Sequence, residues 1–381
     1  MAWKVCLSDI DFGREEVDRV TEVLNSKWLS MGDVTGEFEA RLAEFLGVRH
    51  AFLVCNGTAA LHLANLAVGV RPGDEVIVPS LSFVATANAS AYCGAAPVFA
   101  DIVSEHDLNL SPQDVGRKIG AKTKAITVLH YAGYVADMEA IGRIAREHDL
   151  AVIEDAAHAP GASRDGARAG SFGAVGCFSF FSNKNLVTGE GGAVVTNDDR
   201  VAEEIRLLRS HGMTSLTYER HKGHAFTYDV LRLGWNYRAS EITAVLALVQ
   251  LEKLERNNAR RLELTQAYRR RLANDERLTL PFLDHAGRSS CHLMPILLPA
   301  GTDRERVMAG LRERGIQSSV HYPPIHRFGI YSSHGGAGSL SMTEKVAERQ
   351  LTLPLHPLMS DADVEAVTSA LAEALAEEGA P

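Results

Sequence analysis

Short apolar segments alternate with amphipathic segments between residues 50 and 200, and this alternation constrains the fold more than any other feature of the sequence. The apolar segments are rich in β-branched residues and lack polar alternation, which is typical of strands buried on both faces. The pattern predicts strands at 50–55, 74–80, 96–101, 124–130 and 150–156, and helices at 58–69, 85–94 and 138–149. Such a series predicts an α/β fold with a mostly parallel sheet between layers of helices.

The next part of the sequence adds a strand pair that encloses a loop. Residues 174–181 and 191–198 are predicted to be strands running to and from the loop that contains Lys184. From about residue 198 to 275 the pattern becomes helical and ends in a long charged helix at 240–272. A helix of that length is predicted to span the body of the protein or to lie at an interface.

A later change of pattern predicts a domain boundary. Pro281 and Gly287 interrupt the helical periodicity, and a small α+β unit follows them. Its predicted elements are 291–299, 303–315, 318–324 and 360–378. We therefore predict a large domain at 1–280 and a small C-terminal α+β domain at 281–381. The glycine- and serine-rich stretch 332–341 predicts a mobile loop.

Charge and composition argue against several classes of function. The chain has 381 residues, a formal net charge of -9 and no basic stripe, so no nucleic-acid partner is expected. The cation-rich stretches 268–272 and 312–317 are predicted to be solvated helix faces. No apolar run is long enough to cross a bilayer, and no membrane partner is expected. Five scattered cysteines without C-x-x-C spacing and a start without a signal-peptide core predict free thiols and a cytoplasmic location.

A lysine within an aromatic stretch is the first candidate for chemistry. Lys184 follows Phe178, Phe180 and Phe181, and Glu190 is the nearby candidate for an ion-pair partner. Burial of the ammonium would lower its pKa and make the amine a nucleophile. The stretch alone leaves two interpretations open, a solvated strand end or an amine held in a pocket.

Three other stretches offer groups that bind a phosphate or an aromatic ring. Gly57 and Thr58 lie between a predicted strand and a helix, where free N–H groups bind anions, although an ordinary N-cap at Thr58 explains the pattern equally well. Ser179 precedes Lys184 by five residues and can donate to a phosphate. Phe83 follows a predicted strand and either stacks on an aromatic ring or belongs to the core.

Glu154, Asp155 and His158 form a polar cluster at the end of a predicted buried strand. Ligand-facing residues of such sheets lie at the carboxyl ends of strands, and an aspartate there can keep a pyridine nitrogen protonated. The same three residues suit a metal, but no H-E-x-x-H or comparable spacing is present, and we predict no metal site. A pyridoxal 5′-phosphate site needs an anion site, a carboxylate, an amine and a stacking ring. These stretches offer all four, so the sequence predicts this cofactor.

Five stretches together closely resemble one family, the DegT/DnrJ-type sugar aminotransferases. They are GTAAL (57–61), PSLSFVATANA (79–89), EDAAHAPGA (154–162), FSFFSNKNLVTGEGG (178–192) and LGWNYRASEITAVLALVQLEKLE (233–255). Each stretch is weak alone, but the set is specific, and the similarity extends from residues 24–47 to residues 321–326. The resemblance implies an aspartate-aminotransferase-like large domain (fold type I of the pyridoxal-phosphate enzymes), with an N-terminal segment near the substrate.

The resemblance also implies a role for each candidate residue. Lys184 would carry the cofactor as a Schiff base, Asp155 would pair with the pyridine nitrogen, and His158 would contact the 3′-oxygen. Phe83 would stack on the exposed face of the ring. The residues implied to hold the phosphate are Gly57, Thr58 and Ser179.

A homodimer with two composite active sites is a further implication. In this family a residue of the second subunit completes the phosphate site, and the candidates in the GWNYR stretch are Asn236 and Arg238. The residues implied to contact the sugar substrate are Trp28, Tyr131, His321 and Tyr322.

The implied reaction moves an amino group from L-glutamate or glutamine to a keto sugar nucleotide. Some relatives carry histidine in place of Lys184 and act as dehydratases, so the lysine favours transamination. The HYAG stretch (130–133) resembles that of enzymes aminating carbon 4 of a 4-keto-6-deoxy sugar. Amination at carbon 3 and cyclitol ketones as acceptors stay open.

The sequence argues against two other classes of protein. A catalytically silent family member with a regulatory role need not keep Lys184, Asp155 and Ser179 together, so their presence argues against it. A nicotinamide-dependent oxidoreductase would carry G-x-G-x-x-G after its first strand, and the GEGG stretch (189–192) lacks that order.

Overall fold

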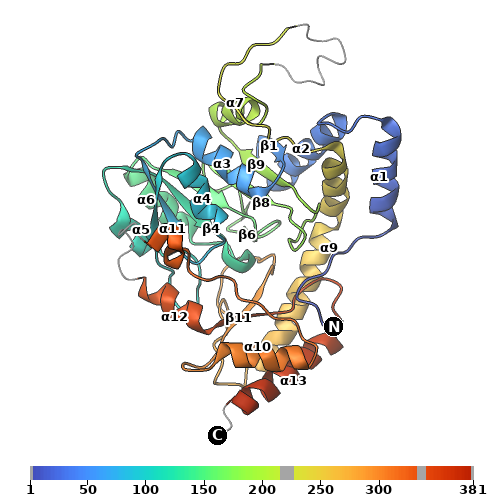
Figure 1. Cartoon of the computed structure of the whole chain (residues 1–381), viewed down its shortest axis with the longest axis vertical. Coiled ribbons are helices and arrows are strands. Elements are labelled where there is room, and N and C mark those ends of the chain that lie inside the picture. Colours follow the sequence, from blue (N-terminus) through green and yellow to red (C-terminus); the bar gives the residue numbers. More distant parts are fainter. Residues whose placement is uncertain (1–2, 215–226, 333–339, 379–381) are drawn as a thin grey trace.

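A seven-stranded sheet forms the centre of the molecule (Figure 1). The computed structural model describes residues 3–214, 227–332 and 340–378. The strand order is β1-β9-β8-β5-β4-β2-β3. The strands are β1 (His50–Val54), β2 (Glu75–Pro79), β3 (Ala96–Ala100), β4 (Thr123–Leu129), β5 (Ala151–Asp155), β8 (Val175–Ser179) and β9 (Gly192–Thr196).

The sheet is mostly parallel, as the alternating pattern predicted. Only β9 runs antiparallel to its neighbours, β1 and β8, whereas β8, β5, β4, β2 and β3 all run parallel. Phe178 of β8 lies opposite Ala193 of β9, so the predicted strand pair on either side of Lys184 is confirmed.

Apolar cores lie on both faces of the sheet, because successive strand residues point to opposite faces. On β2, Ile77 belongs to one core, while Val76 and Val78 belong to the other. The helices that follow the strands are α3 (Gly57–Ala67), α4 (Ala85–Tyr92), α5 (Pro112–Lys118), α6 (Met138–Glu147) and α7 (Asp199–Leu208). Shorter elements are η1 (Tyr131–Gly133) and the strand pair β6 (Ser163–Arg164) and β7 (Ala167–Arg168).

Two N-terminal helices that the sequence pattern did not reveal pack against the long helix near the edge of the sheet (Figure 1). They are α1 (Arg14–Ser26) and α2 (Asp33–Leu46), and the long helix is α9 (Glu241–Leu272). The carboxylate of Glu241 accepts the backbone N–H groups of Gly32 at 2.8 Å, Val34 at 2.9 Å and Thr35 at 3.0 Å. The first residue of α9 thus supplies the side-chain cap that the N-terminus of α2 needs.

The C-terminal part of the chain forms a smaller α+β unit. Its elements are β10 (Met294–Leu297), α10 (Arg304–Glu313), η2 (Ile325–Arg327), α11 (Gly329–Ser332), α12 (Ser341–Arg349), β11 (Gln350–Leu353) and α13 (Asp361–Glu378). The apolar core around the antiparallel β10–β11 pair also contains Val5, and Leu264, Tyr268 and Leu272 from the second half of α9. This core extends across residue 280, and the domain boundary there stays a prediction. Residues 333–339 of the predicted mobile loop lie outside the described residues.

A helix needs about 20 mostly apolar residues to cross a bilayer. Within the described ranges, no helix is both long enough and apolar enough to do so. The five cysteines are free thiols, and Cys93, Cys177 and Cys291 are buried.

Candidate active site

A cavity of about 500 Å³ lies at the carboxyl ends of the parallel strands. The last residues of β4, β5 and β8, which are Leu129, Asp155 and Ser179, all line it. Nine of the 13 candidate residues from the sequence also line it, namely Gly57, Thr58, Phe83, Asp155, His158, Ser179, Lys184, His321 and Tyr322. The topology of the sheet therefore brings together side chains from both ends of the chain.

Lys184 lies in the turn after β8, and its side chain opens onto this cavity. Its backbone N–H donates to the carbonyl of Phe181 at 2.9 Å, which closes the turn. Loss of solvent around the ammonium lowers its pKa to about 8, and the negative charge of Asp155 opposes part of that shift. The charge that favours the ammonium thus comes from Asp155, whereas Glu190 is an exposed residue at the cavity wall.

Asp155 is 4% exposed and is held by two donors. The hydroxyl of Thr86 donates to Oδ2 at 2.8 Å, and the N–H of Ala157 donates to Oδ1 at 3.2 Å. Burial raises the pKa of Asp155, and these two bonds and the charge of Lys184 oppose the rise. Because each carboxylate oxygen has two acceptor sites, Asp155 can still accept a proton-bearing ligand nitrogen from the cavity.

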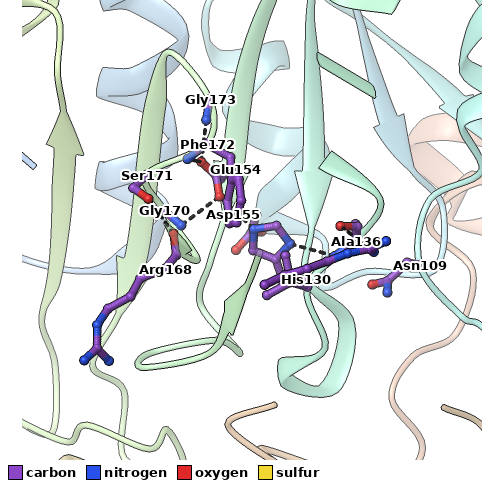
Figure 2. Close-up of polar contacts among 12 residues, drawn as sticks. Asn109, His130, Ala136, Glu154, Asp155, Arg168, Gly170, Ser171, Phe172 and Gly173 are labelled. Carbon is purple, nitrogen blue, oxygen red and sulfur yellow. Dashed lines mark hydrogen bonds and ion pairs between the residues drawn. The ribbon is translucent and has the colours of Figure 1, made fainter. Parts of the chain in front are cut away.

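The adjacent Glu154 has a different environment, which Figure 2 shows. Its carboxylate accepts the N–H groups of Gly170 at 2.7 Å, Phe172 at 2.7 Å and Gly173 at 2.6 Å. The ring of His130 donates to the same carboxylate at 2.8 Å, because its other nitrogen accepts the N–H of Ala136 at 3.2 Å. Four protein donors therefore occupy the oxygens of Glu154, and in the described part of the chain no three side chains group as metal ligands.

His158 and Tyr322 form a hydrogen-bonded pair at the cavity wall. The Nδ1 atom of His158 accepts the backbone N–H of Ala132 at 3.3 Å, so the ring proton lies on Nε2 and is donated to the Tyr322 hydroxyl at 2.8 Å. Burial and the nearby charge of Lys184 lower the pKa of His158 well below its usual range, which keeps the ring neutral. The Tyr322 hydroxyl accepts from His158 and thereby keeps its own proton to donate.

His321 is fixed by its contacts with β11. Its N–H donates to the side-chain carbonyl of Gln350 at 2.9 Å, and the amide nitrogen of Gln350 donates to the hydroxyl of Thr352 at 2.7 Å. The Thr352 hydroxyl then donates to Nδ1 of His321 at 3.0 Å, which leaves the ring proton on Nε2. Burial and the charge of Lys184 lower the pKa of His321 to about 4.

Tyr131 is not among the residues that line the cavity, and its contact with the substrate stays a prediction. Its side chain is 0% exposed, and its hydroxyl donates to the backbone carbonyl of His321. Its ring packs edge-on against His158. Tyr131 therefore supports two cavity residues from behind.

The start of α3 provides an anion site. Asn56 caps this helix by accepting the N–H of Ala59 at 2.8 Å, so Asn56, and not Thr58, is the N-cap. The N–H groups of Gly57 and Thr58 precede the first helical hydrogen bond, and both residues line the cavity. A Cβ atom on Gly57 would lie 2.7 Å from Cβ of Ser179, so only glycine allows the helix start to approach this serine.

Asn236, Arg238 and Trp28 lie outside the main cavity. Asn236 is exposed, and Arg238 donates to the hydroxyl of Ser210 at 2.9 Å. The residue between them, Tyr237, lines a second hollow of about 630 Å³ that adjoins the first at Asn56 and Thr58. A Cβ atom on Gly32 would lie 2.7 Å from Nε1 of Trp28, which places the indole over the start of α2.

Three cavity residues or supports were not among the predicted site residues. Thr86 holds Asp155, Ser82 bonds to the Thr86 hydroxyl at 2.6 Å, and Asn183 lines the cavity. The signal for Thr86 was its position three residues after Phe83, one helical turn away. For Asn183 the signal was its position directly before Lys184.

The donor set agrees with pyridoxal 5′-phosphate. One cavity contains an amine of lowered pKa, a buried carboxylate with free acceptor capacity, and a helix N-terminus with a serine hydroxyl. Phe83 stands 58% exposed at its wall, where a flat ligand can stack on the ring.

Comparison with known proteins agrees with this geometry. Residues 11–372 match the DegT/DnrJ/EryC1/StrS aminotransferase family. GDP-perosamine synthase of Caulobacter vibrioides is 39% identical over 94% of this chain and 95% of that protein. Helicobacter pylori PseC, an aminotransferase involved in the biosynthesis of pseudoaminic acid, superposes with a TM-score of 0.92 at 32% identity, over 98% of this chain and 99% of that one.

A third similar structure is the PLP form of Streptococcus pneumoniae Spr1654, with a TM-score of 0.90 at 26% identity over 99% of this chain and all of that one. The predicted family and its fold type are thereby confirmed. The chain belongs to the DegT/DnrJ/EryC1/StrS family and is a pyridoxal-phosphate-dependent sugar aminotransferase.

Proposed function

We propose that this protein transfers the amino group of L-glutamate or L-glutamine to the keto carbon of a 4-keto-6-deoxy sugar nucleotide. The observation that carries the proposal is the shared cavity of Lys184 and Asp155, whose volume of about 500 Å³ suits a small-molecule site. The similarity to a GDP-perosamine synthase supports a nucleotide-linked substrate. Carbon 4 as the site of amination rests on the sequence of residues 130–133.

Pyridoxal 5′-phosphate, when bound, supplies the aldehyde and the electron-withdrawing ring that the reaction needs. Lys184 would attach to the aldehyde, and Asp155 would accept a hydrogen bond from the protonated ring nitrogen. His158 would contact the ring oxygen, and Phe83 would cover a face of the ring. The proposed phosphate ligands are Gly57, Thr58 and Ser179.

Lys184 also moves protons in the proposed reaction. With a pKa of about 8, roughly one amine in ten is unprotonated at pH 7, far more than for an ordinary lysine. An amine with this pKa can both accept and return a proton near neutral pH. The neutral rings of His158 and His321 add no positive charge beside it.

The sugar-binding side of the cavity is formed by His321 and Tyr322 in this proposal. The Nε2 proton of His321 and the hydroxyl proton of Tyr322 are both available to a sugar oxygen, because their other positions are already bonded. Trp28, which lies over the start of α2, is proposed to contact the sugar from the N-terminal segment. Tyr131 contributes by holding the backbone of His321.

A homodimer with composite sites is also part of the proposal. Three apolar side chains are exposed here: Leu233 is 87% exposed, and Val230 and Leu231 are each about half exposed. Such a cluster suits a surface that a second copy covers. These residues precede Asn236 and Arg238, so the same contact would bring one of these two side chains to the phosphate of the partner's site.

An absorption spectrum of the purified protein tests the cofactor and the donor together. We expect a yellow band from lysine-bound cofactor that changes when L-glutamate or L-glutamine is added. A panel of keto sugar nucleotides and a cyclitol ketone then identifies the acceptor, and NMR of the product identifies the aminated carbon. The matched control is Lys184→Ala, which should stay folded and lose turnover. Turnover in that variant, or a colourless protein after addition of pyridoxal phosphate, would contradict the proposal.

A further inference from the structure

A small cavity next to the turn of Lys184 is lined by two residues with a buried polar atom that has no partner in the described part of the chain. It has a volume of about 20 Å³ and is lined by Asn183, His292, His321 and Ser8, with leucines and Thr352 around them. Within the described ranges, Nε2 of His292 and Oδ1 of Asn183 have no hydrogen-bond partner. Buried polar atoms are nearly always bonded, and this volume suits one water molecule.

The proton on His292 can be assigned from its neighbours. The amide nitrogen of Asn185 donates to Oδ1 of Asn258 at 2.8 Å and to the carbonyl of Ser290 at 2.7 Å, so Oδ1 of Asn185 is an acceptor. This oxygen lies 3.0 Å from Nδ1 of His292, which must therefore carry the proton. Burial lowers the pKa of His292 well below its usual range, so the ring is neutral and Nε2 is an unused acceptor.

A single water molecule meets the needs of this cavity. Its two protons match the two unused acceptors, Nε2 of His292 and Oδ1 of Asn183. Its oxygen can accept from the hydroxyl of Ser8, which lines the same space. Three hydrogen bonds are typical of a structural buried water.

The position of this water relates it to catalysis. Asn183 and Asn185 are the two neighbours of Lys184 in sequence. We propose that His292 holds both of them, Asn185 by a direct hydrogen bond and Asn183 through one buried water, and so fixes the turn that presents Lys184. His292 is thus a positioning residue with a specific water-binding site.

His292 is itself held firmly enough to act in this way. Its N–H donates to the carbonyl of Ala132 at 2.9 Å, and it is 4% exposed. Its ring lies 4.5 Å from that of His158 between centroids. The next residues lead into β10 of the C-terminal unit, so the two proposed contacts of His292 join that unit to the turn of Lys184.

Three substitutions separate the two contacts of His292. His292→Asn keeps a donor near Nδ1 for Asn185 but is too short to reach the water. His292→Gln places an amide oxygen near the position of Nε2 and loses the direct bond. His292→Phe removes both, and His148→Asn on the exposed surface is the control.

Crystal structures of the cofactor-free proteins give the first measurement. We expect a water peak between His292 and Asn183 in the wild type, in the control and in His292→Gln, and no peak in His292→Asn or His292→Phe. An empty cavity in the wild type, or a water unaffected by His292→Asn, overturns the proposal. This result does not depend on the proposed reaction.

The rate at which added pyridoxal phosphate attaches to Lys184 gives the second measurement, and this one rests on the proposed function. A misplaced lysine should attach on the order of tenfold more slowly in His292→Asn, at a melting temperature that shows a folded protein. A wild-type rate in His292→Asn and His292→Phe would show that the contacts of His292 do not position Lys184. If the wild type itself attaches no cofactor, the proposed function fails. The electron density of the cofactor-free crystals still shows whether the water is present.

Discussion

At the scale of single residues, the site depends on one amine kept out of water. Lys184 follows the buried aromatic residues Phe178, at the end of β8, and Phe180, just after it. Its pKa is about 8 because burial in this region leaves the ammonium little solvent. Asp155 provides a compensating charge. The arrangement favours reactivity over stability, since the folded protein holds the proton of Lys184 less tightly than the unfolded chain does.

This difference predicts a pH-dependent stability. Between pH 8 and about pH 10.4, the ordinary lysine value, the unfolded chain binds a proton that the folded protein lacks, so stability rises with pH in that window. Lys184→Met removes the titrating group, so at pH 7 the variant should have a higher free energy of unfolding than the wild type. We expect this difference to fall by about 2 kcal/mol from pH 7 to pH 10. Denaturant titrations of the cofactor-free proteins at several pH values measure this.

The exposed Lys122 provides the matched control, since it lies on the surface before β4. Lys122→Met should show no comparable change with pH. If Lys184→Met and Lys122→Met follow the same pH profile, Lys184 is not desolvated and the argument for its reactivity is lost.

The same residue scale shows what the sequence could and could not predict. That Lys184 and Asp155 line one cavity could be expected from the sequence, because the carboxyl ends of parallel strands meet at one edge of the sheet. The different environments of Glu154 and Asp155 were not predictable. The environment of Glu154 depends on backbone N–H groups within residues 170–173, which only the folded chain brings to its carboxylate. The burial of Tyr131 depends likewise on His321, which lies far away in sequence.

At the scale of elements, β5 explains how two adjacent carboxylates acquire different roles. Successive residues on a strand point to opposite faces, so Glu154 faces the loop before β8 and Asp155 faces α4 through Thr86. The Glu154 network fixes the end of β5 (Figure 2), and Asp155 is the next residue. The geometry of Asp155 therefore depends on a residue that does not line the cavity.

Glu154→Gln tests this dependence. Each oxygen of Glu154 accepts two bonds, and an amide nitrogen in place of one oxygen would face two donors. We expect a loss of about 3 kcal/mol or more in the free energy of unfolding, because hydrogen bonds to a charged group are lost in a buried site. Thermal and denaturant unfolding measure it, and the exposed Glu147→Gln should stay within about 0.5 kcal/mol of the wild type. A variant as stable as the control would show that the network is not needed.

At this scale, the elements that the sequence predicted well are the buried ones. Strands β2, β4 and β5 are buried on both faces and were predicted to within about two residues, because their apolar composition is dictated by two cores. Helices α1 and α2 were missed. Helix α1 is mostly exposed, and the cap of α2 comes from Glu241, more than 200 positions later in the sequence.

At the scale of the whole molecule, α9 connects the large unit to the C-terminal unit (Figure 1). Its first half contributes Ala244, Leu248 and Leu251 to a core beside the sheet, and its second half contributes Leu264 and Tyr268 to the core around β10 and β11. The helix is preceded directly by Asn236 and Arg238, so the element that joins the two units also positions the proposed intersubunit contact.

Mixed dimers test whether the active site is shared between two copies of the chain. In the proposed arrangement Lys184 serves its own subunit, while Asn236 or Arg238 serves the partner's site. Lys184→Ala and Asn236→Ala (or Arg238→Ala) should each be nearly inactive alone. After mixing in equal amounts with unfolding and refolding, half of the dimers are mixed and each has one intact site, so about a quarter of wild-type activity should return.

The variant that complements Lys184→Ala identifies the residue that crosses the interface. A side chain that acts within its own subunit cannot be complemented, because each of the two sites of a mixed dimer then carries one of the two defects. Refolding each variant alone controls for recovery, and sedimentation velocity establishes that dimers form. If neither Asn236→Ala nor Arg238→Ala restores activity with Lys184→Ala although dimers form, each site is complete within one chain and the composite-site proposal is wrong.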